Sequence, residues 1–335
     1  MTQSSKEFPR TFLPDELDLG SWPEVEPWVR RLLDRAVGSR EELEAWLLDV
    51  SELQAAISEE RSRRYIAMTC DTADTEAEAA YLELVQEFMP AAKPWLHKLN
   101  EFFVASPHRR DLDPGRYGVL DRDIAAEIEL FREENIELQT EASLLAQKYQ
   151  KLSGAMTVQF RGEERTMPQM AKFVEETDRD LRRQAWEATW ERRLQDRENF
   201  DATFDELVAV RDRIARNADC ADYREYTFKA YRRFDYTPRD CEEFHTAVET
   251  VVMPLVNELT EQRRRALELD TLRPWDFAVD PLGRAPLKPF DGSDELSAGV
   301  RRIMHRLDPE LEVQFAGMME RGELDLESRK GKAPG

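Results

Sequence analysis

Apolar residues recur along most of the chain at steps of three and four, the spacing that places side chains on one face of an α-helix. The first such stripe comprises Leu43, Trp46, Leu47, Val50, Leu53 and Ile57. Ser39 and Glu42 precede it with the spacing of a capping box, in which the serine oxygen and the glutamate carboxylate accept hydrogen bonds from free amides. The pattern predicts a helix that begins near residue 40 and packs its stripe into a core.

A longer stripe follows Asp121 and predicts one continuous helix that ends at Gly154. Its apolar members alternate steps of four and three: Ile124, Ile128, Phe131, Leu138, Leu145, Tyr149 and Leu152. Asn135 and Ala142 fill the two gaps. Core packing explains this stripe best, because helical hairpins in globular proteins use the same spacing. A dimeric coiled coil is the alternative.

One interruption, residues 157–167, predicts a short β-hairpin with Gly162 in its turn. Helices are predicted from Pro168 onward and again from Thr237-Pro238, the latter with a kink at Pro254. Residues 270–293 contain four prolines and three large aromatics, and we expect this segment to be extended and pinned by its aromatic rings. The sequence therefore predicts a mainly α protein, a multi-helix bundle with one β-hairpin.

The composition excludes two broad classes of protein. Apolar residues make up 41% of the 335, including 16 Phe, 8 Tyr and 7 Trp, which is too much to remain unburied in a disordered chain. The net charge of −21 repels phosphate backbones, so we expect no nucleic-acid partner. No Lys or Arg occurs between Arg64 and Lys93. This acidic stretch is best interpreted as a solvated face, with attraction of cationic ligands as the alternative.

Membrane association and disulfide bonding are not expected either. No stretch approaches the roughly 18 consecutive apolar residues of a membrane-spanning helix. Residues 1–9 lack the apolar core of a signal peptide. The three cysteines, Cys70, Cys220 and Cys241, are odd in number and form no Cys-x-x-Cys pair. A cytoplasmic location fits these features best.

The sequence shows no complete catalytic or metal-binding motif. None of its four histidines, His97, His108, His245 and His305, is followed by Glu, so His-Glu-x-x-His is absent. His97 with Glu101 and His245 with Glu249 could each supply two metal ligands, but a zinc site needs three or four, and surface pairs are expected. Nucleophile elbows and glycine-rich phosphate loops are also absent. From chemistry alone, we name no catalytic or metal-binding residue.

Five groups of residues nevertheless follow one another in a specific order. They are Thr157–Phe160 with Gly162-Glu163; Asp178-Arg179 with Arg182–Trp186; Leu207–Ala215; Val252–Leu255 with Leu272–Asp276 and Pro286–Phe290; and Met318, Gly322, Leu324–Leu326 and Arg329–Gly335. In this order they resemble the oligoendopeptidase F branch of the thimet-oligopeptidase-like zinc metallopeptidases. The resemblance implies part of a two-lobed fold, with residues 1–200 as an N-terminal helical oligopeptidase domain and 201–335 as the start of the catalytic domain.

The resemblance also implies zinc-dependent hydrolysis of short peptides. In that family, the stretch similar to Arg329–Gly335 precedes the helix that carries His-Glu-x-x-His, whose histidines bind zinc together with a further Glu. The present sequence stops before such a motif. We therefore expect this chain alone to be inactive and to bind no zinc, and we expect its missing partner to be the C-terminal half of the same protein. Arg329, Lys330 and Lys332 are its candidate channel-lining residues.

A non-catalytic acidic helical scaffold, or a peptide-binding module, is the alternative function. The stripe from Ile124 to Leu152 and the acidic stretch from Tyr65 to Ala92 favour it. This alternative predicts a self-contained globule. The peptidase hypothesis predicts uncovered apolar surface within residues 207–326.

Overall fold

The computed structural model describes residues 10–333, which form two compact units. The core unit comprises residues 10–151 and 198–247, and the hairpin unit comprises residues 152–197 and 248–333. Residues 1–9, in which we expected no signal-peptide core, lie outside the described residues, as do the last two residues of the C-terminal motif. The division into domains at residue 200 stays a prediction.

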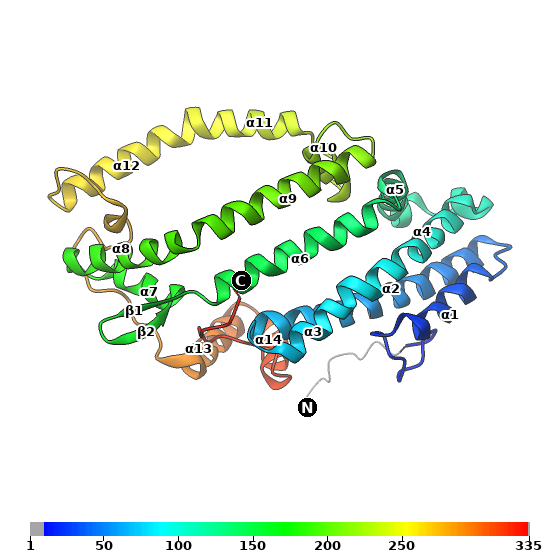
Figure 1. Cartoon of the computed structure of the whole chain (residues 1–335), viewed down its shortest axis with the longest axis horizontal. Coiled ribbons are helices and arrows are strands. Elements are labelled where there is room, and N and C mark those ends of the chain that lie inside the picture. The colour runs from blue at the N-terminus through cyan, green and yellow to red at the C-terminus, as the bar shows by residue number, and fades with distance from the viewer. Residues whose placement is uncertain (1–9, 334–335) are drawn as a thin grey trace. The chain divides into compact units, whose positions relative to one another are not determined.

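The core unit is built from helices (Figure 1). They are α1 (Trp22–Leu33), α2 (Arg40–Cys70), α3 (Thr75–Glu83), α4 (Met89–Ala105), α5 (Pro114–Leu130), α6 (Asn135–Gly154), α9 (Arg197–Asn217), α10 (Tyr223–Ala230) and α11 (Pro238–Ala247), with a π-turn at Leu84–Phe88 and a 3₁₀ turn at Pro107–Asp111. The last turn of α6 and the first residue of α9 belong to the hairpin unit.

The hairpin unit adds the two strands. Its elements are β1 (Thr157–Phe160), β2 (Glu163–Thr166), α7 (Met167–Ala171), α8 (Arg179–Gln195), α12 (Met253–Ala266), α13 (Gly292–Leu307) and α14 (Pro309–Glu320), with 3₁₀ turns at Lys172–Glu175 and Pro274–Asp276 and a π-turn at Val248–Val252. The expected fold class, mainly α with one short β-hairpin, is confirmed. Among residues 10–333, no helix combines the length and the apolar character needed to cross a membrane.

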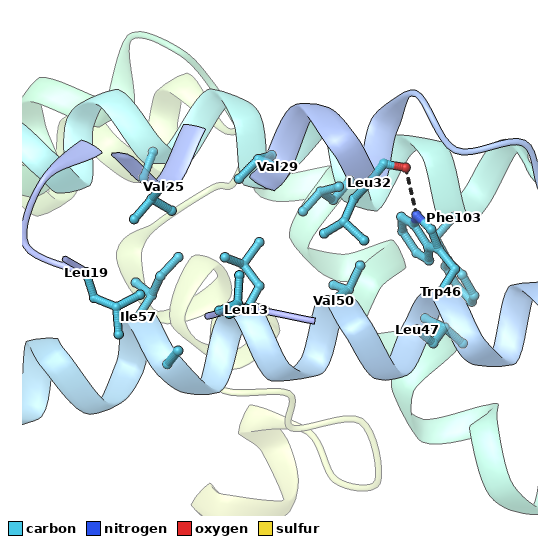
Figure 2. Close-up of a cluster of buried hydrophobic side chains, with 14 of the residues drawn as sticks. Leu13, Leu19, Val25, Val29, Leu32, Trp46, Leu47, Val50, Ile57 and Phe103 are labelled. Carbon is cyan, nitrogen blue, oxygen red and sulfur yellow. Dashed lines mark hydrogen bonds between the residues drawn. The ribbon is translucent and has the colours of Figure 1, made fainter. Parts of the chain in front are cut away.

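The apolar stripe of α2 lies at the centre of the core unit, as predicted. All six of its members are buried, and side chains from α1 and α4, such as Leu32 and Phe103, pack against them (Figure 2). The indole Nε1 of Trp46 donates a hydrogen bond to the carbonyl oxygen of Leu32 at 3.0 Å. This bond matters because a buried indole N–H without a partner would cost stability.

The predicted start of α2 is also confirmed. Ser39 Oγ accepts a hydrogen bond from the Glu42 amide at 3.2 Å. The Glu42 carboxylate accepts from the amide of Gly38, at 2.6 Å, rather than from that of Ser39. The reciprocal bond of the capping box is therefore shifted by one residue, and both contacts still satisfy free amides at the helix start.

The second stripe is divided between α5 and α6, and the expectation of one continuous helix is wrong. The two helices are separated by residues 131–134. Arg132 Nη1 donates to the carbonyl oxygen of Glu129 in the last turn of α5, at 2.9 Å, and to that of Phe131 directly after this helix, at 2.7 Å. Asn135 is 1% exposed, and its Nδ2 donates to the carbonyl oxygen of Ile214 at 3.0 Å. These side chains satisfy polar groups at the break, so the helix can end there.

The predicted β-hairpin is confirmed in its range and its turn. β1 and β2 pair antiparallel, with Phe160 opposite Glu163. The two residues between them, Arg161 and Gly162, have φ values of 54° and 87°. Two positive φ values in a two-residue loop define a type I′ turn, whose twist matches that of the paired strands. Glycine adopts this conformation without steric cost.

The predicted helix start at Thr237-Pro238 is confirmed as well. α11 begins at Pro238, and the Asp240 carboxylate accepts hydrogen bonds from the amide and hydroxyl of Thr237, both at 2.7 Å. At Pro254 we expected a kink. The structure places the π-turn Val248–Val252 directly before the helix that contains this proline. A π-turn accommodates backbone groups that a proline prevents from forming regular helical bonds.

Candidate functional site

The buried carboxylate of Asp276 joins two of the motif groups within the hairpin unit. Asp276 ends the 3₁₀ turn after Arg273 and is 0% exposed. Arg179 contacts both carboxylate oxygens, Nε to Oδ1 at 3.0 Å and Nη2 to Oδ2 at 2.9 Å. Arg182 Nη2 donates to Oδ1 at 3.1 Å, and the Arg273 amide donates to Oδ2 at 2.9 Å. Bidentate arginine–carboxylate contacts of this kind are strong and fix a single geometry.

Both arginines come from the first turn of α8 and lie three residues apart, which places them on one face of the helix. Arg182 is 3% exposed, yet its remaining nitrogens have partners. Its Nε donates to the carbonyl oxygen of Trp275 at 2.9 Å, and its Nη1 donates to those of Glu176 and Thr177, both at 2.9 Å. A buried guanidinium is tolerated because four of its five N–H groups donate hydrogen bonds to oxygen atoms.

The ionisation of Asp276 follows from these contacts. Burial alone would raise the pKa of this carboxyl, but hydrogen bonds from Arg179, from the Arg273 amide and from Arg182 hold the pKa below its ordinary value. The hydrogen bond to Asp276 is also the main reason that the pKa of Arg179 is raised. The cluster stays ionised at neutral pH, so Asp276 is unsuited to proton transfer near pH 7. Its contacts indicate a positioning role.

The aromatic residues of segment 270–293 contribute unequally to its anchoring. Trp275 packs against Trp186 of α8 with ring centroids 5.4 Å apart, as we expected for a pinned segment. Phe277 and Phe290 are 51% and 44% exposed, so they do not pin it. The expectation is right for one ring, and Asp276 supplies the anchor that the sequence analysis did not assign.

The three candidate channel-lining cations all contact partners within the hairpin unit. Lys330 Nζ lies 2.8 Å from the Glu164 carboxylate on β2. Arg329 Nη1 lies 2.6 Å from Asp325 Oδ1, and Lys332 Nζ donates to the carbonyl oxygen of Asp325 at 2.6 Å. These contacts fix the local conformation of the segment. That the three cations line a channel stays a prediction.

The same C-terminal segment is bonded to the hairpin and to α7. Ser328 Oγ and Thr166 Oγ1 lie 2.7 Å apart, and Gln169 Nε2 donates to the Ser328 carbonyl oxygen at 3.2 Å. The Gly331 amide donates to the carbonyl oxygen of Gly154 at 3.0 Å. The first and last of the motif groups, far apart in sequence, are therefore neighbours in the folded unit.

The histidine pairs do not form a metal site. His97 Nε2 lies 3.5 Å from Glu101 Oε1, which is the expected pair one helical turn apart. The His97 ring stacks on the Phe131 ring with centroids 3.8 Å apart. Within the described part of the chain, His245 and Glu249 form no ion pair. Among residues 10–333, no three His, Cys, Asp or Glu side chains gather where they could hold a metal ion. The described residues therefore do not fit a zinc centre.

One feature of the core unit was missed by the sequence analysis. A cavity of about 500 Å³ lies between α2, α3, α4 and α6, and Lys93 is one of the residues that line it. Periodicity gives no signal for such a cavity. The signal that could have found it is the position of Lys93, which ends the long cation-free stretch and stands within the otherwise apolar run Met89–Leu96.

Two family models match the chain. The Peptidase M3 N-terminal domain matches residues 20–131, and Peptidase family M3 matches residues 172–308. No curated protein matches it.

Solved structures are similar to almost the whole chain. A protein assigned as oligoendopeptidase F shares 26% identity with a TM-score of 0.88, and covers 98% of this chain. PZ peptidase A, solved with an inhibitor, shares 26% identity with a TM-score of 0.87 over 98%. A Bacillus anthracis strain Ames protein, also assigned as oligoendopeptidase F, has the same fold at 22% identity, with a TM-score of 0.87 over 99%.

The chain covers 57%, 57% and 60% of those three proteins, so it spans less than two thirds of their length. The motif groups that carry the resemblance include Asp276 and Arg179, which lie inside the region matched by the family model. The order of these groups, the two family models and the structural likeness agree. The chain belongs to peptidase family M3, in its oligoendopeptidase F branch.

Proposed function

We propose that this chain is the N-terminal part of a zinc-dependent oligoendopeptidase that hydrolyses short peptides, and that it is inactive by itself. The match of two M3 family models to residues 20–131 and 172–308 carries this proposal. The sequence contains no His-Glu-x-x-His, and its described residues do not fit a zinc centre. In such an enzyme the metal ligands and the general base would be supplied by residues other than these.

The surface of the hairpin unit supports the C-terminal half of the same enzyme as the partner. α12 buries none of its side chains. Leu255, Val256 and Leu259 on this helix are 58%, 41% and 63% exposed. Clustered apolar side chains at a surface are typical of a face that another protein segment covers. The same surface disfavours the scaffold alternative, which predicts a self-contained globule.

We further propose a cytoplasmic location. Cys220 and Cys241 are free thiols. Free thiols are typical of proteins in reducing compartments, where disulfides are rare.

A peptidase assay tests the proposed function. The purified chain is incubated with internally quenched fluorogenic peptides, with and without added Zn²⁺ and with a chelator. We expect no chelator-sensitive cleavage. Cleavage that the chelator abolishes would overturn the proposed inactivity.

The coding sequence provides a second and independent test. A reading frame that continues beyond residue 335 is expected to encode His-Glu-x-x-His, and the extended chain is expected to cleave the same peptides with chelator sensitivity. A continuing frame without that motif, or an extended chain without activity, would contradict the peptidase assignment.

A further inference from the structure

The cavity beside Lys93, here called the Lys93 cavity, has an unusual set of charges. It measures about 500 Å³, within the range of pockets that hold small ligands. Lys93 and Arg61 both line it, together with hydroxyl-bearing side chains such as Ser62, Tyr65 and Tyr81. No Asp or Glu is among its described lining residues. Two cations and several hydroxyls therefore face one space without a carboxylate.

Lys93 has one hydrogen-bond partner, which is uncharged. Its Nζ donates to Gln139 Oε1 at 2.7 Å, and it forms no ion pair with any described residue. A second cavity, of about 670 Å³, also borders Lys93 and Arg61, and among the described residues that line it Glu127 is the one acidic residue. The Glu127 carboxylate is already engaged by Asn100 Nδ2 at 2.8 Å and by Arg232 Nη2 at 2.6 Å. The ammonium group lacks a counter-ion on both sides.

Arg61 is likewise without a carboxylate among the residues described, although its neighbours on α2 have one. Arg63 pairs with Glu59 at 2.6 Å, and Arg64 pairs with Glu60 at 2.7 Å. The chain has 69 acidic and 48 basic residues, so carboxylates are in excess. Two unpaired cations at one cavity are therefore not explained by a shortage of acidic partners.

The protonation of Lys93 agrees with this geometry. Burial, together with the positive charge of Arg61, lowers the pKa of Lys93 to about 8. Burial also raises the pKa of Tyr81, so its hydroxyl remains a neutral donor. An anion in the cavity would favour the charged ammonium and relieve its repulsion with the guanidinium. The ionisable groups that face the two cavities are Arg61, Tyr65, Tyr81, His97, Glu127 and Tyr226.

We propose that the Lys93 cavity binds a small oxyanion, the carboxylate, phosphate or sulfate group of a ligand, between Lys93 and Arg61. The two cations supply charge-assisted hydrogen bonds, the strongest type available to an oxyanion at a protein surface. The tyrosine and serine hydroxyls are the further donors. This site belongs to the core unit by itself and does not depend on peptidase activity.

Calorimetric titration of the full chain with sulfate at pH 7 and constant ionic strength tests the site. We expect saturable binding that Lys93→Gln weakens about ten- to a hundredfold and Arg61→Gln about three- to tenfold, because the arginine is more exposed. The matched controls are Lys98→Gln on α4 and Arg63→Gln on α2, which remove the same charge from outside the cavity. Circular dichroism checks that each variant is folded.

The controls should change sulfate affinity by less than about twofold at this ionic strength. Equal losses in Arg63→Gln and Arg61→Gln would show that only net charge matters and would overturn the site. Absence of saturable binding to the wild-type chain by sulfate, phosphate and carboxylate probes would overturn it as well. Because Arg61 is exposed, its variant keeps the test valid even if Lys93→Gln unfolds.

The source of the oxyanion is distinguished by matched probes. N-acetyl-dialanine with a free carboxylate is compared with its C-terminal amide and with inorganic phosphate. Binding of the acid peptide above both the amide and phosphate assigns the cavity to a peptide carboxylate. Binding of phosphate and sulfate, with no difference between the two peptides, assigns it to a free oxyanion.

The pH dependence of sulfate binding gives a readout that a purely structural role would not change. Sulfate keeps its charge between pH 7 and 9, whereas Lys93 loses its proton as the pH rises through about 8. Affinity should therefore fall over this range in the wild-type chain and in Arg61→Gln, and the slope should disappear in Lys93→Gln. A slope that persists unchanged in Lys93→Gln would contradict the assignment.

Discussion

The core unit and the hairpin unit hold their elements together by different chemistry. In the core unit, α1, α2 and α4 share one apolar cluster that contains fully buried large side chains such as Trp46 and Phe103. Among the described residues of the hairpin unit, the apolar cluster has four buried members, Val158, Phe160, Met170 and Ala185, with partly buried apolar side chains packed against them. There, α8 is joined to segment 270–279 by the carboxylate of Asp276.

This difference shows what each type of interior can achieve. Apolar burial contributes stability in proportion to area, so the core unit is expected to be stable by itself. A buried ion cluster fixes a geometry but contributes little net stability, because desolvation offsets the attraction. α12 and α14 bury none of their side chains, and α13 buries only Ser297. The hairpin unit thus has defined geometry together with uncovered apolar surface.

The largest expected effect comes from removing the central charge of the hairpin unit. Asp276→Asn leaves the guanidinium of Arg182, which is 3% exposed, without its counter-ion. Breaking a buried ion pair on one side costs about 3–5 kcal/mol of unfolding free energy. Hydrogen exchange should show loss of protection in α8 and segment 270–279, while α2 and α4 keep theirs. Equal losses in both units would contradict the comparison.

Asp180→Asn is the matched control. Asp180 lies in the first turn of α8 beside Arg179, and its carboxylate pairs with Arg183 at the surface, at 3.2 Å. This control variant should change the unfolding free energy by less than about 1 kcal/mol.

The stabilisation by Asp276 should depend on pH. The pKa of Asp276 is lowered in the folded state, so its contribution to the unfolding free energy is complete above the unfolded pKa of about 3.9 and is lost as the pH falls through the folded pKa. The difference between wild type and Asp276→Asn should be constant from pH 5 to 8 and shrink below pH 4.

In the core unit, the corresponding test is a change in apolar volume. Leu43 is 0% exposed in the stripe of α2, and Leu43→Ala should lower the unfolding free energy by about 2–5 kcal/mol through lost burial and a cavity. Leu48 on the same helix is 62% exposed, and Leu48→Ala should stay within about 0.5 kcal/mol. Urea unfolding followed by hydrogen exchange measures both. A similar loss in the two variants would show that burial does not dominate this unit.

Features set by neighbouring residues were predictable from the sequence. The α2 stripe with its Ser39 cap and the hairpin with Gly162 in its turn depend on residues within a few positions of each other. The break between α5 and α6 was not predictable, because its buried Asn135 bonds to Ile214, 79 residues away. Periodicity describes one helix face and contains no information on such distant partners.

The candidate site shows the same limit. The family resemblance included Arg179 and Asp276, but in separate stretches, and their bond spans 97 residues. Their shared role is visible only in the folded unit. For the Lys93 cavity, the sequence offered a single isolated cation, which by itself does not distinguish a surface lysine from a ligand-binding one.

The smallest effect on stability is expected on α12, where it should accompany a clear effect on association. Leu255 and Leu259 are 58% and 63% exposed, so replacing both with Ser should change the unfolding free energy by no more than about 0.5 kcal/mol per residue. If this apolar face is uncovered, it drives self-association of the purified chain. Light scattering at increasing protein concentration should show less association in the double variant. Leu48→Ser, which changes an equally exposed leucine of the core unit, should leave association unchanged. An equal decrease in self-association in both variants would show that any exposed leucine promotes association. The apolar face of α12 would then be no more an interface than the surface of α2.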